Sequence, residues 1–366
     1  MSPNEPVLNK FFRVAIKTQA SDLHLKVGQP PKLRIRGELK DTTGEAITAE
    51  AMEQMVFEIL SPAQKESFLE SGTVDFAHEI GAEDRFRINV FRQRNVISLA
   101  ARRVNTEIPP FEKLHLPKVL EKICNGTNGM VLTVGPTGCG KTTTIISMID
   151  YINRNHSCNI VTIEDPIEYL LKDKKAIISQ REIGIDVEDF DHALKYLMRQ
   201  DPDVVYIAEI RDYKGVVAAM RAAETGHLVL GTMHSASAAH AVQRLLDLFP
   251  QNERELARQT LSLTIRAIIS QILLPSVKEG VDRIPAVEIL ITNPSVRKLI
   301  AEGREADLPS VIRNSREEGM LDFTDSLTEL IMNGSIEPKE AYKYAPNVEE
   351  LKMALKGIRA DTTGIL

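Results

Sequence analysis

The chain has 366 residues, of which 43% are hydrophobic and 26% are charged. These values are ordinary for globular proteins and exclude a disordered or fibrous chain, and the length predicts about two domains. The formal net charge of −6 disfavours a protein that binds DNA through its overall charge, so we expect no nucleic-acid partner. Three cysteines without a CxxC pair exclude a disulfide framework and a four-cysteine zinc site, and favour a reducing compartment.

The opening residues contain no cationic segment followed by a long apolar run, so they do not resemble a signal peptide. No stretch of the sequence approaches the ~20 apolar residues that cross a bilayer. We therefore expect a soluble, cytoplasmic protein that does not insert directly into a membrane.

Residues 1–105 have the pattern of a small α+β domain. Apolar residues recur at helical spacing from Val7 to Ile16, and the alternation through residues 23–27 predicts a half-buried strand. A Gly-Gln-Pro-Pro turn signal then precedes a second short strand. The later segments of this domain are predicted as a helix over 49–70 and strands over 85–90 and 96–101.

Residues 106–113 contain two prolines and few core residues, and we predict that they are a linker. In residues 114–366, short apolar runs alternate with longer helical patterns, which predicts a parallel sheet covered by helices on both faces. From about residue 250 onward the pattern is mostly helical, with one long amphipathic helix expected over 252–274. The last segment, 357–366, is expected to fray.

A phosphate-binding loop is the most specific motif. The residues GPTGCGKT match G-x-x-x-x-G-K-[ST], and they stand between an apolar strand pattern and a helical pattern, as that motif requires. Lys141 is predicted to reach the β- and γ-phosphates and Thr142 to bind Mg²⁺. We treat Cys139 as a small loop residue rather than a nucleophile. The residues predicted to contact the nucleotide here are Gly135, Pro136, Thr137, Gly138, Cys139, Gly140, Lys141, Thr142 and Thr143.

Three further apolar strands of this domain end in ionisable residues. One ends in Glu164 and Asp165, one in Glu209 and one in His234. Ligands of parallel α/β sheets bind at the carboxyl ends of the strands. We therefore predict that these side chains gather around the nucleotide that Lys141 binds.

Each acidic residue has a catalytic interpretation and a plainer one. Glu209 ends the pattern DPDVVYIAE and is predicted to polarise the attacking water, or alternatively to pair with Arg211. Glu164 and Asp165 are predicted to orient the nucleophile or hold Mg²⁺, with Asp165 as the metal ligand. The alternative for this pair is a capped turn at Pro166.

Two histidines flank one predicted strand and have different expected roles. His227 and His234 are seven residues apart, which is roughly 23 Å in an extended chain, so both cannot touch one phosphate. His234 is at the carboxyl end of the strand and is predicted to sense the γ-phosphate. The role of His227 at the opposite end stays open between packing and pairing at a contact surface.

Arginines are crowded in the first domain between residues 85 and 103. The plain interpretation is a solvated strand face. The functional one is that some of these arginines point across a cleft between the domains toward nucleotide phosphates, since the planar guanidinium binds phosphate with two hydrogen bonds. The six are Arg85, Arg87, Arg92, Arg94, Arg102 and Arg103. Alternate spacing places Arg85 and Arg87 on one face of their strand.

Several motifs together resemble the PilT family, the retraction ATPases of type IV pili within the secretion-ATPase superfamily. The matching text is SDLHL (21–25), RFRINVF (85–91), GPTGCGKTTT (135–144), TIEDPIEY (162–169), QRE (180–182), DPDVVYIAEIRD (201–212) and AAETGHLVLGTMHSASA (222–238). The resemblance implies a PAS-like N-terminal domain followed by a RecA-like P-loop ATPase domain. It also implies ATP and Mg²⁺ as cofactors and a ring-shaped homo-hexamer at the cytoplasmic base of the pilus, where it acts on an inner-membrane platform protein.

The family's functional positions carry over to particular residues of this chain. The resemblance assigns Lys141 and Thr142 to the Walker A motif, Glu164 to an Asp box, Glu209 to the Walker B motif, His227 and His234 to a His box, and Arg85, Arg87 and Arg92 to a region near the nucleotide. Two departures stand out. The loop has GCGKTT where GSGKST is usual, which keeps the chemistry, and the family's AIRNL motif appears as SVRKL over 295–299.

Four functions fit the sequence to different degrees. The first is a pilus retraction motor. The second is a pilus-extension or secretion ATPase, although such relatives usually carry a further N-terminal domain and often a four-cysteine metal site. The third is a PilU-like accessory ATPase that works with a second pilus ATPase. The fourth, a RecA-like nucleic-acid translocase, is disfavoured by the acidic net charge.

Overall fold

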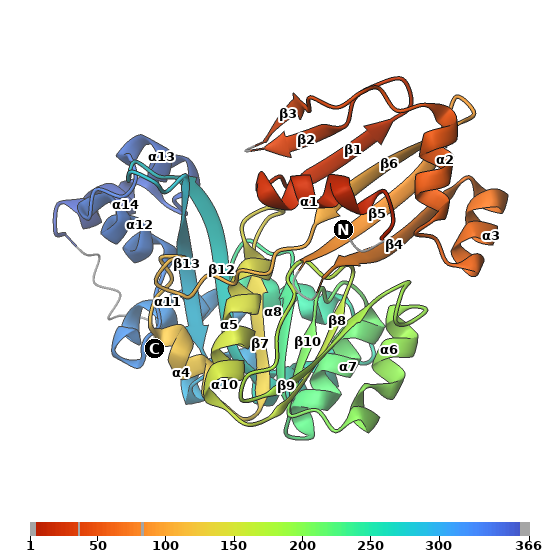
Figure 1. Cartoon of the computed structure of the whole chain (residues 1–366). Helices are drawn as coiled ribbons and strands as arrows, with labels where there is room; N and C mark the ends of the chain where they lie inside the picture. The colour runs from red at the N-terminus through yellow and green to blue at the C-terminus, as the bar shows by residue number, and fades with distance from the viewer. Residues whose placement is uncertain (1–4, 36, 82–83, 359–366) are drawn as a thin grey trace. The chain divides into compact units, whose positions relative to one another are not determined.

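The computed structural model describes residues 5–35, 37–81 and 84–358, and the chain divides into two compact units (Figure 1). The first unit comprises Met1–Glu107 with Glu168–Leu170, and the second comprises Ile108–Ile167 and Leu171–Leu366. The short segment joins the first unit by backbone pairing, because Asn105 donates to the carbonyl of Glu168 and accepts from the N–H of Leu170. Most of the segment 357–366, for which fraying is predicted, is outside the described residues.

The first unit is built on an antiparallel sheet with the strand order β3-β2-β1-β6-β5-β4. Its elements are α1 (Asn9–Lys17), β1 (Asp22–Lys26), β2 (Lys32–Ile35), β3 (Glu38–Asp41), α2 (Ala49–Phe57), α3 (Pro62–Ser71), β4 (Thr73–Ile80), β5 (Asp84–Gln93) and β6 (Val96–Arg103). Phe12 of α1, Leu23 and Leu25 of β1 and Phe86 of β5 share one buried cluster. The predicted α+β character of this region is confirmed.

Residues 49–70, which are predicted to be helical, form two helices in the structure, α2 and α3. The break is at Ser61, whose side chain accepts from the N–H of Gln64 while the Gln64 side chain accepts from the N–H of Ser61. This reciprocal pairing starts a new helix, and Pro62 occupies its first position, where no backbone donor is needed.

The second unit contains a mostly parallel sheet with the order β13-β12-β7-β11-β10-β8-β9, in which only β13 is antiparallel to its neighbour. Its strands are β7 (Gly129–Val134), β8 (Asn159–Glu164), β9 (Ile177–Glu182), β10 (Val204–Ile207), β11 (Leu228–Met233), β12 (Ile265–Pro275) and β13 (Arg283–Ile291). Its helices are α4 (Val119–Cys124), α5 (Lys141–Asn155), α6 (Phe190–Leu197), α7 (Tyr213–Glu224), α8 (Ala238–Asp247), α9 (Arg254–Thr264), α10 (Pro294–Ala301), α11 (Leu308–Asn314), α12 (Phe323–Met332), α13 (Pro338–Tyr344) and α14 (Val348–Leu355), with 3₁₀ turns at Met198–Gln200, Glu305–Asp307 and Arg316–Glu318.

Helices cover this sheet on both faces. Met130, Leu132 and Val134 of β7 pack in one apolar cluster with residues of α7, α8 and α9. Side chains alternate between the faces of a strand, so Val131 and Thr133, which are also fully buried, face the opposite side, where α5 packs. The predicted fold class, an α+β domain followed by a P-loop α/β domain with a largely parallel sheet, is confirmed.

The long helix predicted over 252–274 is wrong beyond Thr264. Helix α9 ends at Thr264, and from Ile265 onward the chain is strand β12, which runs parallel to β7 and antiparallel to β13. Most of β12 is buried, so its apolar residues do not alternate with polar ones. Such a run has no strand period and cannot be distinguished from a buried helix by its pattern.

The linker predicted over 106–113 is not an exposed spacer throughout. The Phe111 ring is 5% exposed and stacks on Tyr151 of α5 at a centroid distance of 5.7 Å. The carbonyl of Pro109 accepts a hydrogen bond from the Ser147 hydroxyl at 2.7 Å. Pro109 and Phe111 thus pack within the second unit, which begins at Ile108.

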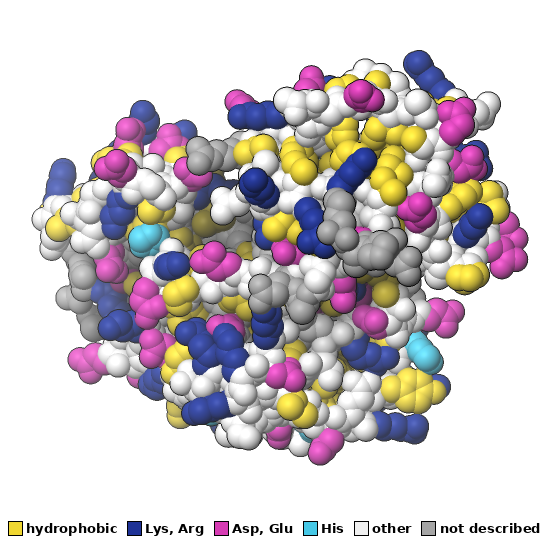
Figure 2. All heavy atoms as spheres, viewed as in Figure 1, with side chains coloured by type: hydrophobic (Ala, Val, Ile, Leu, Met, Phe, Trp, Pro, Cys, Tyr) yellow, Lys and Arg dark blue, Asp and Glu magenta, His cyan; other side chains and the backbone are white. Residues whose placement is uncertain are grey.

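Lys and Arg side chains are interspersed with Asp and Glu over the face shown in Figure 2. On this face of the described residues, neither sign of charge dominates, in keeping with the small net charge of the whole chain. No helix within residues 5–35, 37–81 and 84–358 combines the length and apolar character that a membrane crossing requires.

Candidate active site

The phosphate loop connects β7 to α5, and its backbone requires glycine at two positions. Gly135 has φ +154° and Gly140 has φ +91°. A Cβ atom on Gly135 would lie 2.3 Å from the carbonyl oxygen of Gln271, and one on Gly140 would lie 2.8 Å from the Gln271 amide nitrogen. These approaches are too close for any side chain, so the glycines allow the loop to pack against β12.

Lys141 is the first residue of α5 and folds back over the loop. Its ammonium donates to the carbonyl oxygens of Gly135 and Pro136, both at 3.0 Å. Burial lowers the pKa of Lys141, while the neighbouring Cys139 and Glu209 act in the opposite direction. Among the described residues, the ammonium therefore has only backbone partners, and phosphate oxygens could replace them.

The other loop residues lie where the motif predicts. Thr142 and Thr143 are half-buried in the first turn of α5. The side chain of Cys139 is 3% exposed, and burial raises the pKa of its thiol. A nucleophilic cysteine needs the thiolate form, so this environment suits a packing role for Cys139.

The four predicted strand ends lie at one edge of the sheet. Strands β7, β11, β10 and β8 are consecutive and parallel, so their carboxyl ends share an edge. Lys141, His234, Glu209 and Glu164 follow or end these strands in that order. The strand ends that were expected to converge are therefore neighbours in the sheet, although Glu164 is three strand spacings, or about 14 Å, from β7.

Glu209 and His234 form the closest pair among these residues. The Glu209 carboxylate lies 3.6 Å from Nε2 of His234, and each side chain is a little over one-third exposed. The ends of β10 and β11 are fixed by two hydrogen bonds, from the Ile210 N–H to the Thr232 carbonyl and from the Thr232 hydroxyl to the Ala208 carbonyl. This bracing holds a carboxylate and an imidazole side by side, next to the strand that leads to the phosphate loop.

Glu164 occupies a different environment from Glu209. It is 1% exposed, and its carboxylate accepts hydrogen bonds from the Thr162 hydroxyl at 2.7 Å and the Gln180 amide at 2.8 Å. Gln180 comes from the neighbouring strand β9, in the QRE segment that the sequence singled out without a role. The hydrogen bonds from Thr162 and Gln180 thus fix the buried carboxylate of Glu164 at the end of β8.

Asp165 and Thr142 supply oxygen atoms of the kind that Mg²⁺ prefers. The Asp165 side chain is 43% exposed and lies 3.9 Å from the guanidinium of Arg211, so Arg211 approaches Asp165, whereas the sequence offered it as a partner for Glu209. Within the described residues, no group of three or more His, Cys, Asp or Glu side chains could hold a metal.

The structure does not bring the three predicted arginines together. Arg85 and Arg87 share one face of β5, while Arg92 lies on the other face, where its guanidinium is 5.3 Å from the ring centroid of Phe68. Two other arginines of the cluster have structural partners, because Arg102 pairs with Asp22 and Arg103 pairs with Asp84.

His227 lies at the amino end of β11, opposite the edge that carries His234. Its Nδ1 is 2.9 Å from the carbonyl oxygen of Ala222 and 3.0 Å from the Thr225 hydroxyl. The sequence-based expectation that the two histidines are at opposite ends of one strand is met by these positions.

Two buried residues of the site could not be found from the sequence. Gln271 of β12 donates its amide to the carbonyl of Cys139 at 2.6 Å and accepts from the Thr144 hydroxyl at 2.8 Å. Glu288 of β13 accepts from the Ala238 N–H at 2.7 Å, and burial raises its pKa. Gln271 thus braces the phosphate loop, and Glu288 anchors the start of α8, the helix that follows the His234 loop.

We expect that Gln271→Met weakens both stability and nucleotide binding. The substitution keeps the volume but leaves a buried carbonyl and hydroxyl without their partner, which costs about 1–3 kcal/mol for each group. Because the loop would lose its support, we expect the Kd for ADP to rise about tenfold, the equivalent of about 1.4 kcal/mol. Chemical denaturation and equilibrium nucleotide titration measure the two effects.

The matched control is Gln243→Met, which changes an exposed glutamine on α8. It should leave both quantities within error of the wild type. A Gln271→Met protein that loses stability but binds ADP with the original affinity would show that the shape of the loop does not depend on this amide.

Comparison with known proteins places the chain in a family. Residues 112–303 match the family described as type II/IV secretion system protein. The chain is 35% identical to the type IV pilus ATPase PilU of Pseudomonas aeruginosa, over 95% of this chain and 91% of that protein. It is also 35% identical to the retraction ATPase PilT of the same organism, over 92% and 98%.

Further matches extend along most of the chain. A twitching motility protein of Neisseria gonorrhoeae is 38% identical over 88% of this chain and 86% of its own length. A crystal structure of the pilus retraction motor PilT with bound ADP superposes with a TM-score of 0.85 at 41% identity, over 95% of this chain and 99% of that one. The chain therefore belongs to the type II/IV secretion system protein family, and its full-length relatives include the PilT-type pilus ATPases.

Proposed function

We propose that this chain is an ATP-driven motor that retracts type IV pili. The proposal rests on one observation above all: the phosphate loop and the Glu209–His234 pair share one sheet edge. It is supported by relatives along nearly the whole chain that are named for pilus retraction and twitching motility.

The chain is an ATP hydrolase, and we assign the following roles to its residues. Glu209 accepts a proton from water as the water oxygen attacks the γ-phosphorus, and the bond to the bridging oxygen of ADP breaks. Lys141 and the amino end of α5 stabilise the negative charge on the phosphate oxygens. His234 contacts the γ-phosphate and couples its presence to Glu209. Thr142 and Asp165 would hold Mg²⁺, which would supply positive charge to neutralise the phosphate oxygens.

The assembly is proposed to be a homo-hexamer at the cytoplasmic base of the pilus, where it drives an inner-membrane platform protein. This part of the proposal is supported by the family resemblance. Arg85 and Arg87, which share a strand face, are proposed to contact nucleotide, whereas the ring contact of Arg92 makes it the weaker member of the set.

A PilU-like accessory role is the second candidate, because sequence identity does not separate the two kinds of relative. The PilU and PilT relatives from Pseudomonas aeruginosa are equally similar to this chain, at 35% identity over more than nine-tenths of its length. The departure of SVRKL from the family's AIRNL also fits an accessory ATPase that works with a second pilus ATPase. A secretion ATPase is a poorer candidate, since the type II secretion protein E of Xanthomonas campestris is 30% identical over 72% of this chain, below the pilus ATPases in both respects.

Deletion of the gene in its source organism tests the proposal. A retraction motor should leave excess, long and immobile pili and no twitching, because assembly continues without removal of subunits. Complementation should need Glu209, so wild type and Glu337→Gln should restore twitching and Glu209→Gln should not. Loss of pili would instead indicate an extension ATPase, and retraction that persists when this gene alone is missing would indicate an accessory role.

A further inference from the structure

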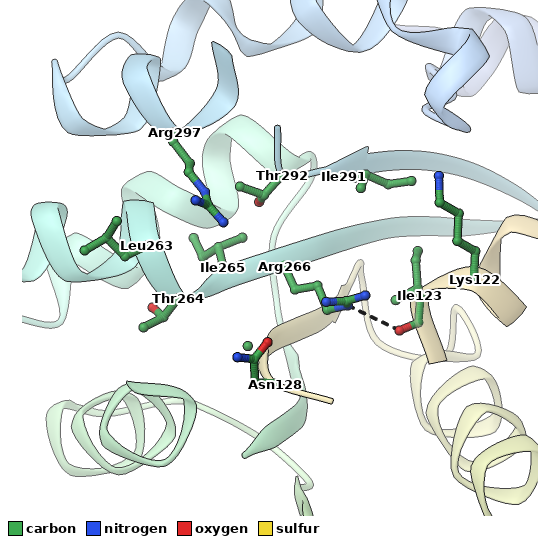
Figure 3. A pocket seen from close by; sticks show the side chains of 11 residues that line it. Lys122, Ile123, Asn128, Leu263, Thr264, Ile265, Arg266, Ile291, Thr292 and Arg297 are labelled. Carbon is green, nitrogen blue, oxygen red and sulfur yellow. Dashed lines mark hydrogen bonds between the residues drawn. The ribbon is translucent and has the colours of Figure 1, made fainter. Parts of the chain in front are cut away.

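A small cavity with mixed polar and apolar lining opens at the sheet edge opposite the phosphate loop. It lies in the second unit where β7 and β12 begin and β13 ends, and its volume is about 160 Å³. Figure 3 shows the side chains around it, which come from α4 with the following turn, the α9–β12 junction, the end of β13 with the next residue, and α10. The polar side chains that line it are Lys122, Asn128, Thr264, Arg266, Thr292 and Arg297.

Arg266 is a half-buried cation in this cavity without an acidic partner among the described residues. Its Nε donates to the carbonyl of Ile123 at 3.4 Å, and burial lowers the pKa of its guanidinium. The turn before β7 leaves space for it, because a Cβ atom on Gly126 would lie 2.0 Å from the guanidinium carbon. Removing a cation from water without a counter-charge is costly, so this arrangement favours an anion.

Three other groups make the cavity better suited to an anion. Arg297 is exposed on α10, has no carboxylate partner within the described residues, and extends toward the cavity in Figure 3. The hydroxyl oxygen of Thr292 is buried and has no hydrogen-bond partner among the residues that the structure describes. Lys122 adds a third positive charge, and its ammonium lies 3.4 Å from the carbonyl of Glu318.

We propose that this cavity binds an oxyanion, which the guanidinium groups of Arg266 and Arg297 hold and the Thr292 hydroxyl supports. Planar guanidinium groups bind phosphate and carboxylate through paired hydrogen bonds. The ligand is either free phosphate or the carboxylate of an acidic side chain from a protein partner. This site is separate from the nucleotide site, because it is at the amino end of β7 and the phosphate loop is at the carboxyl end.

Protection from arginine modification tests this site in the whole protein. The protein is saturated with Mg-ADP, so that its phosphate loop is occupied, and treated with phenylglyoxal with or without phosphate or glutarate. Modification of each arginine is then followed by peptide mass spectrometry. At a probe concentration ten times its Kd, Arg297 and Arg266 should react about tenfold more slowly, as expected for simple occupancy.

The pattern of protection identifies the ligand. Protection by phosphate alone supports a free-phosphate site, protection by glutarate alone supports a carboxylate from a partner, and protection by both supports the shared oxyanion chemistry. Arg244, an exposed arginine on α8, is the internal control and should react equally fast throughout. Protection of Arg297 by neither probe would overturn the proposal.

A substitution tests whether the two arginines share one ligand. Arg266→Met keeps an apolar stem in the cavity and should abolish the protection of Arg297, while Arg266→Lys, which keeps the charge without the planar fork, should retain part of it. The unfolding midpoint identifies any variant that fails to fold. If Arg297 stays fully protected in folded Arg266→Met protein, the two guanidinium groups do not share a ligand and the proposal fails.

Discussion

Lys141→Ala should abolish ATP turnover and weaken nucleotide binding. The ammonium lies over the phosphate loop and donates hydrogen bonds to the carbonyls of Gly135 and Pro136, with no acidic partner in the described part of the chain, so its positive charge is available to phosphate oxygens. A hydrogen bond to a charged group contributes about 1.5–3 kcal/mol, which corresponds to roughly 10–100-fold in the Kd for ATP or ADP. Loss of charge stabilisation in the transition state should lower turnover by a further factor of about 10²–10³.

Titration with a fluorescent nucleotide and phosphate-release kinetics measure these two effects. The matched control is Lys339→Ala on α13, where the side chain is 73% exposed and pairs with Glu337. It should bind and hydrolyse ATP as the wild type does. Retention of normal affinity in a folded Lys141→Ala protein would mean that Lys141 does not contact the nucleotide.

Glu209→Gln should stop hydrolysis and leave binding nearly unchanged. The amide has the shape of the carboxylate but cannot accept a proton from water, so the catalytic step should slow by about 10²–10⁴-fold. The phosphate loop is unaltered, so the Kd for ATP should stay within a few-fold of the wild-type value. Single-turnover hydrolysis and equilibrium binding separate these quantities.

The control for this substitution is Glu337→Gln, at a half-exposed carboxylate remote in sequence from the site. Full activity of the Glu209→Gln protein would remove Glu209 from the mechanism. Assemblies mixed from wild-type and Glu209→Gln chains also test the proposed ring. Activity that falls faster than the fraction of active chains indicates subunits that act in sequence, while a linear fall indicates independent subunits and contradicts the proposed motor.

The sequence was most informative where local chemistry and topology agree. The loop from Gly135 to Thr142 has a fixed spacing that only a strand–loop–helix context satisfies, and the structure has β7 before it and α5 after it. The neighbouring positions of Glu209 and His234 followed from a rule of parallel sheets rather than from their separation in sequence. Their 3.6 Å approach is a consequence of β10 and β11 being adjacent.

Features that depend on tertiary pairing could not be predicted. The change from helix α9 to strand β12 at Ile265 depends on backbone pairing between β12 and β7. A single sequence does not show which strands pair. Gln271 was therefore placed in a helix and its role in bracing the loop was missed. Likewise, alternation placed Arg85 and Arg87 together, but the contact of Arg92 with Phe68 depends on how α3 packs against the sheet.

The bond between Gln271 and the phosphate loop also has a consequence for how the protein is made. The motif is complete once the ribosome has added Thr142, yet the brace that fixes its shape comes from a strand that starts at Ile265, more than a hundred residues later. A nascent chain that has emerged only as far as α9 thus carries every residue of the motif without the support that Gln271 gives. Before β12 is made, the phosphate loop lacks its hydrogen bond to Gln271. We therefore expect high affinity for nucleotide only after this strand has been synthesised.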